Sequence, residues 1–242
     1  MINYEHHSPS SLNLFAASPS MWVLEKILGL KQPGSAVMHR GTAIEAGVAY
    51  GLGNPQANDK DSIKTALSRY DLLTAMSGDA RREKYRDDIP DMVTQALDEL
   101  RPYGVPTDAQ GLVTWHPDGL RYPIIGYYDF KWEHDGIMVD LKTTDKMPAK
   151  IKAGHARQVA MYCGDNHKGL LTYCTPKKCQ TLQLENVREH RQALHNIAKR
   201  VEWFLALSDQ PEFFTTITAP DLDSYYWGSP AARQLAFEIW GV

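Results

Sequence analysis

Two aspartates and a lysine in the middle of the chain have the residue types and spacing of a metal-dependent hydrolytic site. Asp129 precedes an Asp135-Gly136 pair, which is typical of a tight hairpin turn, and Asp140-Leu141-Lys142 follows it. With a two-residue loop, Asp129 lies opposite Lys142, and alternation along the strands puts Asp129, Asp140 and Lys142 on one face. Two carboxylates beside an ammonium group could hold a divalent cation and orient a water molecule.

The other face of this predicted hairpin is apolar. It is formed by Phe130, Trp132, Ile137, Val139 and Leu141. A half-buried hairpin normally carries polar residues on its solvent face, and an Asp-x-Lys triplet often occurs by chance. A longer loop would also change the strand register. The hairpin alone therefore leaves a catalytic site and an ordinary solvated face open.

Composition narrows the class of protein. The 242 residues are 43% hydrophobic, and 26 Lys and Arg against 29 Asp and Glu give a net charge of −3, so no overall basic field indicates nucleic-acid binding. A local groove would still suffice for a nuclease. Three cysteines are too few for a disulfide framework, and neither a secretory signal nor an apolar run of membrane-spanning length is visible. We expect a soluble cytoplasmic protein without membrane contact, in the host cell cytoplasm if it is viral.

The first hundred residues have helical periodicity. We expect helices within 8–30, at 35–50, over the amphipathic stretch that starts near 63, and across 81–101. Gly41 and Gly47 weaken the expectation for 35–50.

The pattern then changes to strands and further helices. We expect strands at 112–115, 122–132 and 137–143, a helix at 155–163, strands at 169–174 and 181–184, and a long helix at 187–207. The segment 209–242 is aromatic and is expected to be irregular. The order predicts an α/β fold with a central mixed β-sheet flanked by helices and a helical N-terminal part.

Three further groups of residues could contribute to a site. Gly41 and Glu45 lie one helical turn apart, so the glycine would let the helix approach a sheet while the carboxylate enters the crevice; a surface glutamate is the alternative. Gln158 and Tyr162 form a second pair with this spacing. A third group consists of basic side chains that could contact phosphates. Alternatively, these side chains are solvated surface charges. They are His39, Arg40, Lys146, Lys150, Lys152 and Arg157, with His155 beside them.

In this order, the motifs resemble those of the PD-(D/E)xK nuclease superfamily, and most closely its RecB-like and phage-exonuclease branch. Its members show Gly-x-x-x-(His/Glu), Gly-x-x-Asp, (Asp/Glu)-x-Lys and Gln-x-x-x-Tyr. The chain reads Gly41…Glu45, Gly126…Asp129, Asp140-Leu141-Lys142 and Gln158…Tyr162, and Ser8–Phe15 is similar to the N-terminal segment of RecB-like nucleases. Pro90-Asp91 is a decoy, because it lies far from Asp140 in a helical pattern.

The resemblance implies a restriction-endonuclease-like core and roles for individual residues. It implies Mg²⁺ or Mn²⁺ held by Asp129, Asp140, the Leu141 carbonyl and Glu45. Lys142 would act on the attacking water, and Gln158 and Tyr162 would position Lys142 and the DNA backbone. We expect a single nuclease domain over 1–242, with a helical part at 1–101, a catalytic core at 102–208 and the terminal segment 209–242.

The resemblance further implies a DNA exonuclease of recombination, repair or phage DNA processing that acts on duplex ends or single strands. A homo-oligomer or a recombination-protein partner is compatible with it. No iron–sulfur cluster is expected, because Ser18 stands where cluster-bearing relatives have cysteine and four thiolates are not available. Open alternatives are a structure-specific endonuclease, a catalytically silent DNA-binding or assembly module, and an unrelated metalloenzyme or small-molecule binding protein.

Overall fold

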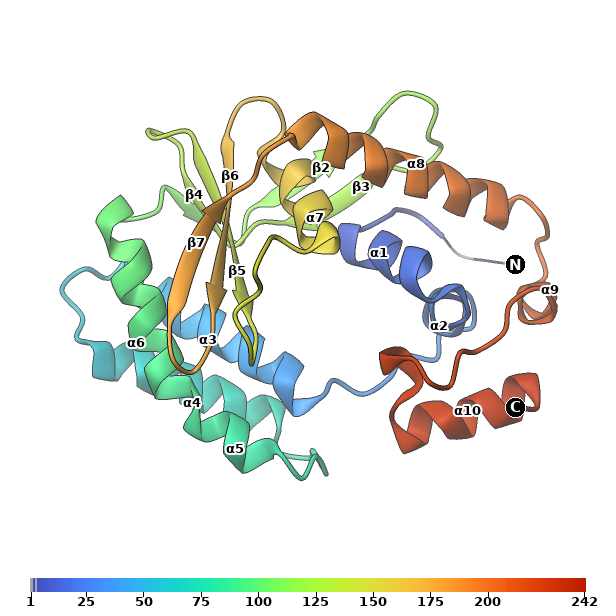
Figure 1. The fold of residues 1–242 in the computed structure, drawn as a ribbon, viewed down its shortest axis with the longest axis horizontal. Coiled ribbons are helices and arrows are strands. Elements are labelled where there is room, and N and C mark those ends of the chain that lie inside the picture. Colours follow the sequence, from blue (N-terminus) through green and yellow to red (C-terminus); the bar gives the residue numbers. More distant parts are fainter. Residues whose placement is uncertain (1, 3) are drawn as a thin grey trace. The chain divides into compact units, whose positions relative to one another are not determined.

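The computed structural model describes residues 2 and 4–242, and their contacts divide the chain into two compact units (Figure 1). One unit contains Gly34–Val113 and Tyr127–Arg188. The other contains the N-terminal segment up to Pro33, together with Thr114–Gly126 and Glu189–Val242. The expected single nuclease domain stays a prediction.

The first unit is built on a five-stranded mixed sheet, which confirms the predicted α/β class. The strand order is β1-β4-β5-β6-β7, where β5 and β6 are parallel and the other neighbours are antiparallel. The strands are β1 (Asp108–Ala109), β4 (Phe130–Trp132), β5 (Ile137–Thr143), β6 (Lys168–Cys174) and β7 (Cys179–Gln183). Helix α7 (Ala153–Cys163) connects β5 to β6, as a parallel pair requires.

Apolar helices cover this sheet. The helical part consists of α3 (Ala36–Gly53), α4 (Asp59–Leu73), α5 (Arg82–Asp87) and α6 (Ile89–Leu100), followed by a 3₁₀ turn at Arg101–Tyr103. Residues of α3, α4 and α6 form one buried cluster with the predicted apolar hairpin face, including Phe130, Val139 and Leu141. Ala156, Val159 and Ala160 of α7 pack against Leu171 and Tyr173 of β6.

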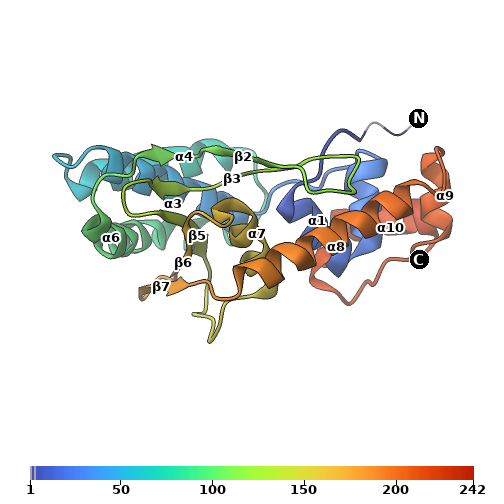
Figure 2. The same cartoon turned by 90° about the horizontal axis from the view of Figure 1, so that it is seen from above.

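The second unit is largely helical. It contains α1 (Pro9–Ala17), α2 (Pro19–Trp22), a π-helical turn (Val23–Ile27), α9 (Pro211–Thr216), a 3₁₀ turn (Tyr225–Trp227) and α10 (Pro230–Trp240). The unit also contains most of helix α8 (Val187–Leu205) and most of the paired strands β2 (Leu112–Trp115) and β3 (Ile124–Tyr127). The chain passes between the units at the ends of these elements. Figure 2 shows these elements from above. None of the helices in the described part of the chain combines the length and apolar character needed to cross a bilayer.

Three expectations for the secondary structure were wrong, and one strand was missed. The stretch 81–101 is divided into α5 and α6, because Pro90 lacks an amide hydrogen and sits in the first turn of α6. The predicted strand 122–132 is divided into β3 and β4, which have different partners, and β1 was missed. The segment 209–242 is not irregular: Ser229 caps α10, whose Ala232 and Ala236 pack against Met21 and Leu24.

The hairpin loop also differs from the expectation. Phe130 pairs with Val139 and Trp132 with Ile137, so the loop is Glu133–Gly136 rather than two residues. The register is therefore displaced by two residues. Because side chains alternate with a period of two, this displacement leaves every side chain on its predicted face. Continued by one residue, the register brings Asp129 level with Asp140 rather than Lys142.

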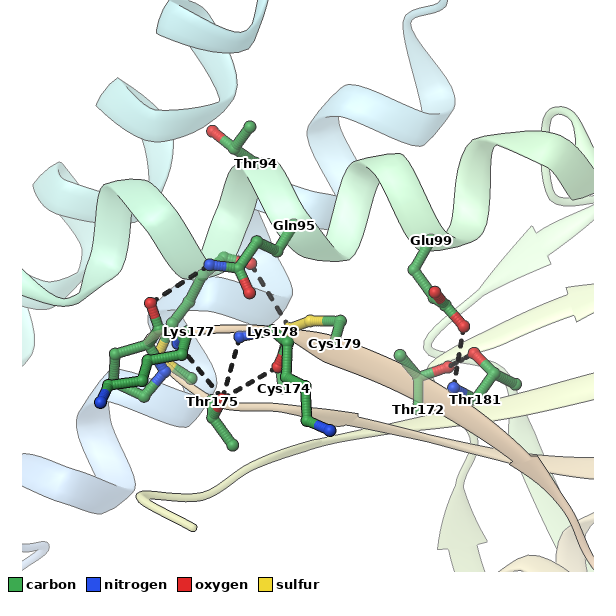
Figure 3. The surroundings of a disulfide bond; sticks show 12 residues. Thr94, Gln95, Glu99, Thr172, Cys174, Thr175, Lys177, Lys178, Cys179 and Thr181 are labelled. Carbon is green, nitrogen blue, oxygen red and sulfur yellow. Dashed lines mark hydrogen bonds between the residues drawn. A yellow bond between two sulfur atoms is a disulfide. The ribbon is translucent and has the colours of Figure 1, made fainter. Parts of the chain in front are cut away.

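The β6–β7 hairpin carries a disulfide that the cysteine count gave no reason to expect. Cys174 and Cys179 are directly paired residues of the two strands, and their sulfur atoms are bonded (Figure 3). Helix α6 holds the same hairpin, because the Gln95 amide donates to the Pro176 carbonyl and Glu99 accepts from the Thr181 amide.

Gly47 allows α3 and α4 to pack closely. A Cβ atom at this position would lie 2.7 Å from the Ser62 carbonyl oxygen and 2.8 Å from the Ala66 Cβ atom. We expect Gly47→Ala to lower the free energy of unfolding by about 1–3 kcal/mol, because the overpacking exceeds the gain in helix propensity. Urea denaturation of the purified protein measures this change.

Gly53→Ala is the matched control, since a Cβ atom there, at the end of the same helix, has no neighbour within 4 Å. It should leave stability unchanged or raise it slightly. Equal effects of the two substitutions would contradict the packing role of Gly47.

Candidate active site

Asp129 lies where the chain leaves the edge of the sheet. Strand β4 pairs with β5 only as far as Val139, so within the described residues the rest of β5 has no strand partner on that side. The Asp129 Oδ2 atom takes the place of the missing strand and accepts a hydrogen bond of 2.6 Å from the Leu141 amide. In an extended strand, the N–H and C=O groups of one residue point to the same side. The Leu141 carbonyl therefore also faces the open edge beside Asp129.

Asp140 is buried, which corrects the expectation of a solvated face. Its residue surface is 1% exposed, and its Oδ2 atom forms an ion pair of 2.7 Å with the Lys142 ammonium group. The Oδ1 atom is also buried and has no hydrogen-bond partner among the described residues. A buried carboxylate oxygen without a donor is costly in free energy, and a bound cation would remove that cost.

Helix α3 brings Glu45 to this pair. At Gly41, a Cβ atom would lie 3.1 Å from the Thr143 hydroxyl, so the glycine lets α3 approach β5 closely. One turn later, the Glu45 carboxylate accepts a hydrogen bond from the Asp129 side chain and is close enough to Asp140 for repulsion to affect its ionisation. The structure thus brings Glu45, Asp129, Asp140 and Lys142 together, although their chemical roles stay predictions.

The crowding of carboxylates changes their ionisation. Burial, followed by repulsion from Asp140 and Glu45, raises the pKa of Asp129 well above its usual range. Burial is also the main cause that raises the pKa of Glu45 and that of Asp140. Burial alone would lower the pKa of Lys142, but attraction to Asp140 and Asp129 outweighs it and raises the pKa. Without a cation, burial and mutual repulsion therefore favour proton binding by Asp129 and Glu45.

The donor set fits a hard divalent cation. Carboxylate oxygens of Glu45, Asp129 and Asp140 and the carbonyl oxygen of Leu141 are the ligand types that Mg²⁺ and Mn²⁺ prefer. In the described part of the chain, no three Asp, Glu, His or Cys side chains already form a complete ligand cluster. Water and the Leu141 carbonyl would have to complete the coordination, which is usual for Mg²⁺.

Helix α7 places the predicted Gln–Tyr pair beside Lys142. The Gln158 amide donates a hydrogen bond of 2.8 Å to the Tyr162 hydroxyl. Burial and the nearby Asp140 carboxylate raise the pKa of Tyr162, which is therefore neutral and can still donate its own proton. The Lys142 charge also influences the ionisation of Tyr162, so the pair lies near the ion pair of Lys142 with Asp140.

His155 is a neighbour of the site that the sequence indicated only as one of several positive charges. Its Nδ1 atom lies 2.8 Å from the Tyr173 hydroxyl. Burial, together with the charges of Lys142 and Lys152, lowers the pKa of His155 to about 4, so the ring is neutral at neutral pH. The signal for it was the spacing of 155, 158 and 162, which places His155 on the α7 face that carries Gln158 and Tyr162.

The structure corrects the predicted phosphate contact at Arg40. This residue is fully buried, and its guanidinium group binds Asp88 at 2.7 Å and Asp145 at 2.8 Å. It also lies over the Tyr85 ring, 4.6 Å from the centroid. Arg40 therefore has a structural role, joining α3 to the segments before α6 and after β5.

The other predicted phosphate contacts are placed differently. The half-buried His39 ring occupies the space beside Gly34, where a Cβ atom would approach it within 2.7 Å. Arg157 is half-buried on α7, and burial lowers the pKa of Arg157. Lys146, Lys150 and Lys152 are exposed in the connection between β5 and α7. These three lysines keep the accessibility that a phosphate contact needs, and their role stays a prediction.

Comparison with known proteins agrees with this arrangement of motifs. Among solved structures, the crystal structure of SSO0001 is similar to this chain, and the match covers 76% of this chain and 86% of that chain. The sequence identity is 14% and the TM-score is 0.34, and both values are too low to transfer any property. Comparison with curated proteins gives no match. The family model of the PD-(D/E)XK nuclease superfamily matches residues 6–221, so the chain belongs to that superfamily.

Proposed function

We propose that this protein is a Mg²⁺- or Mn²⁺-dependent deoxyribonuclease that hydrolyses phosphodiester bonds, with exonuclease activity on linear DNA. The observation that carries the proposal is the convergence of Glu45, Asp129 and Asp140 on Lys142 at an open sheet edge, where one buried carboxylate oxygen has no donor. The family supplies the reaction class, because its members act on nucleic acid.

The proposed division of roles follows from the charges. A divalent cation held by Asp129, Asp140, Glu45 and the Leu141 carbonyl supplies the charge that polarises the phosphate and acidifies water. Lys142 stays protonated beside Asp140, so it orients the attacking water and offsets negative charge that develops on the phosphate. Tyr162 and Gln158 keep the ammonium group in place. The Asp129 carboxylate additionally fixes the backbone of Leu141, because it accepts a hydrogen bond from the Leu141 amide.

Two rivals keep the fold. A catalytically silent DNA-binding or assembly module would not need the complete set of Asp129, Asp140 and Lys142, all of which are present. A structure-specific endonuclease would use the same residues on an internal bond. We favour an exonuclease of recombination, repair or phage DNA processing because the motif order resembles the RecB-like and phage-exonuclease branch. We expect no iron–sulfur cluster, because Ser18 stands where cluster-bearing relatives have cysteine and four thiolates are not available.

The direct test is incubation of end-labelled linear DNA and covalently closed DNA with Mg²⁺ or Mn²⁺. We expect loss of the linear DNA and survival of the closed form. Asp140→Asn is the matched inactive control and should lower turnover about a thousandfold, because metal-derived stabilisation amounts to several kcal/mol. Its melting temperature in EDTA should change little, because the repulsion relieved among three crowded carboxylates offsets the lost ion pair with Lys142. Cleavage of closed DNA would favour the endonuclease, and near-normal turnover of Asp140→Asn would exclude Asp140 as a ligand.

Lys142→Ala separates catalysis from metal binding. Turnover should fall by about 10²-fold or more, because the cation that acts on water and phosphate is lost. Mn²⁺ affinity, measured by calorimetric titration, should be kept or should rise, because a competing positive charge leaves the carboxylates. Loss of Mn²⁺ binding in this variant would contradict the proposed role of Lys142.

The carboxylate cluster should make stability depend on pH and metal. In the folded protein, the pKa values of Asp129 and Glu45 are raised above their ordinary values of 3.8 and 4.5. Protonation of these two groups therefore stabilises the fold, fully so at a pH below their ordinary pKa values. This stabilisation is lost as the pH rises through the raised pKa values. In EDTA, the melting temperature should therefore fall over that range, and Mn²⁺ should oppose the fall.

Glu45→Gln tests the same cluster. It should weaken both the pH dependence in EDTA and the stabilisation by Mn²⁺, because one carboxylate no longer titrates. A variant with the unchanged pH profile and unchanged Mn²⁺ response would show that Glu45 does not belong to the cluster. Differential scanning fluorimetry measures both properties.

A further inference from the structure

Helix α8 presents a row of amide, cationic and aromatic side chains that the proposed active site does not use. We call the set Gln192, Asn196, Lys199, Arg200 and Trp203 the α8 row. Spacings of three and four residues place these side chains on one side of the helix, which is labelled in Figure 2. At 1.5 Å per residue, the row is about 16 Å long. Trp203 is 69% exposed, although tryptophan is usually mostly buried.

The row faces outward because the opposite side of α8 is anchored. Leu194, Ile197, Ala198 and Val201 of the helix are buried. The Glu202 carboxylate is also turned away from the row: it accepts hydrogen bonds from the Arg121 and Tyr122 amides at 3.0 and 2.9 Å and lies 3.1 Å from His7 Nε2. The acidic residue between Lys199 and Trp203 is thus already satisfied and does not neutralise the cations.

The row has positive charge that the protein does not compensate. Within the described residues, neither Lys199 nor Arg200 takes part in a salt bridge. The charge continues along the side of α8 next to the β2–β3 hairpin, where the Arg191 guanidinium lies 4.6 Å from the centroid of the Trp115 ring. The amides of Gln192 and Asn196 are joined by a hydrogen bond of 3.0 Å and add donors and acceptors rather than apolar area.

We propose that the α8 row binds single-stranded DNA, with a base stacked on Trp203 and phosphates held by Lys199 and Arg200. An exposed aromatic ring beside unpaired cations is the combination used for single strands, because every base offers a face for stacking and every nucleotide carries a charge. A helix that docks into a protein groove would present a continuous apolar stripe. Among the described residues on this side of α8, the exposed large apolar side chains are Trp203 and Leu207 at the end of the row. The inference rests on the proposed function in taking DNA as the ligand.

The experiment measures binding of fluorescein-labelled oligo(dT) in EDTA, where metal-dependent cleavage is absent, by anisotropy at several salt concentrations. Trp203→Ala should weaken binding about five- to tenfold, and Trp203→Phe should restore most of the affinity, because stacking needs an aromatic face. Lys199→Ala and Arg200→Ala should each reduce the slope of log affinity against log salt by about 0.7.

Phe237→Ala is the matched control, because Phe237 on α10 is 66% exposed but does not belong to the row. It should bind oligo(dT) like the unmodified protein. The inference is overturned if the protein does not bind oligo(dT), if Trp203→Ala binds normally, or if Trp203→Ala changes only the molecular mass measured by light scattering, which would identify a protein interface.

The two proposals fail separately. Trp203-dependent binding without cleavage in Mg²⁺ would support the α8 row and end the nuclease proposal. Cleavage of linear DNA together with normal binding by Trp203→Ala would do the reverse.

Discussion

The early end of the β4–β5 pairing is the constraint on which the active-site region depends. Beyond Val139, strand β5 continues without a neighbour on that side, and its free backbone groups must find other partners. The Asp129 carboxylate satisfies the Leu141 amide, and this contact draws one acidic group onto the edge where Asp140 and Glu45 already lie. A complete strand would satisfy the backbone equally well but would fill the space in which we propose that a cation and a phosphate bind.

Close packing against β5 and α4 explains why α3 contains glycines in its interior. Gly41 and Gly47 reduce helix propensity, yet each allows a close approach, to β5 in one case and to α4 in the other. Between them, Glu45 reaches the carboxylate pair, while Arg40 holds the helix through Asp88 and Asp145. A buried arginine is costly unless its charge is paired, so Asp88 and Asp145 compensate the Arg40 charge and link α3 to their own segments.

The two units use charged side chains in opposite ways. Around β5, charges are buried and compensate one another incompletely, so binding of a proton or of the proposed cation would lower the cost of burial. Along α8, the acidic Glu202 is satisfied by backbone amides, while Arg200 is exposed and Lys199 is half-buried, each without a salt-bridge partner among the described residues. The first arrangement suits chemistry at one point, and the second suits weak contacts distributed along a chain of phosphates.

The sequence by itself determined which side chains share a face. The hairpin register was displaced by two residues, yet Asp129, Asp140 and Lys142 kept their common face because the strand period is two. The spacing of Gly41 and Glu45 and of Gln158 and Tyr162 similarly fixed their faces on helices. Periodicity also gave the mixed α/β class, since it depends only on local geometry and on the order of the elements.

Only the tertiary structure decided what covers each face. Asp140 is buried rather than solvated, and Arg40 is an internal anchor rather than a phosphate contact. His155 is neutral because burial, together with the charges of Lys142 and Lys152, lowers its pKa. The segment 209–242 is helical because distant residues of α2 and the following turn cover its apolar side. Burial, charge pairing and ionisation depend on residues far apart in the chain, and local spacing carries no information about them.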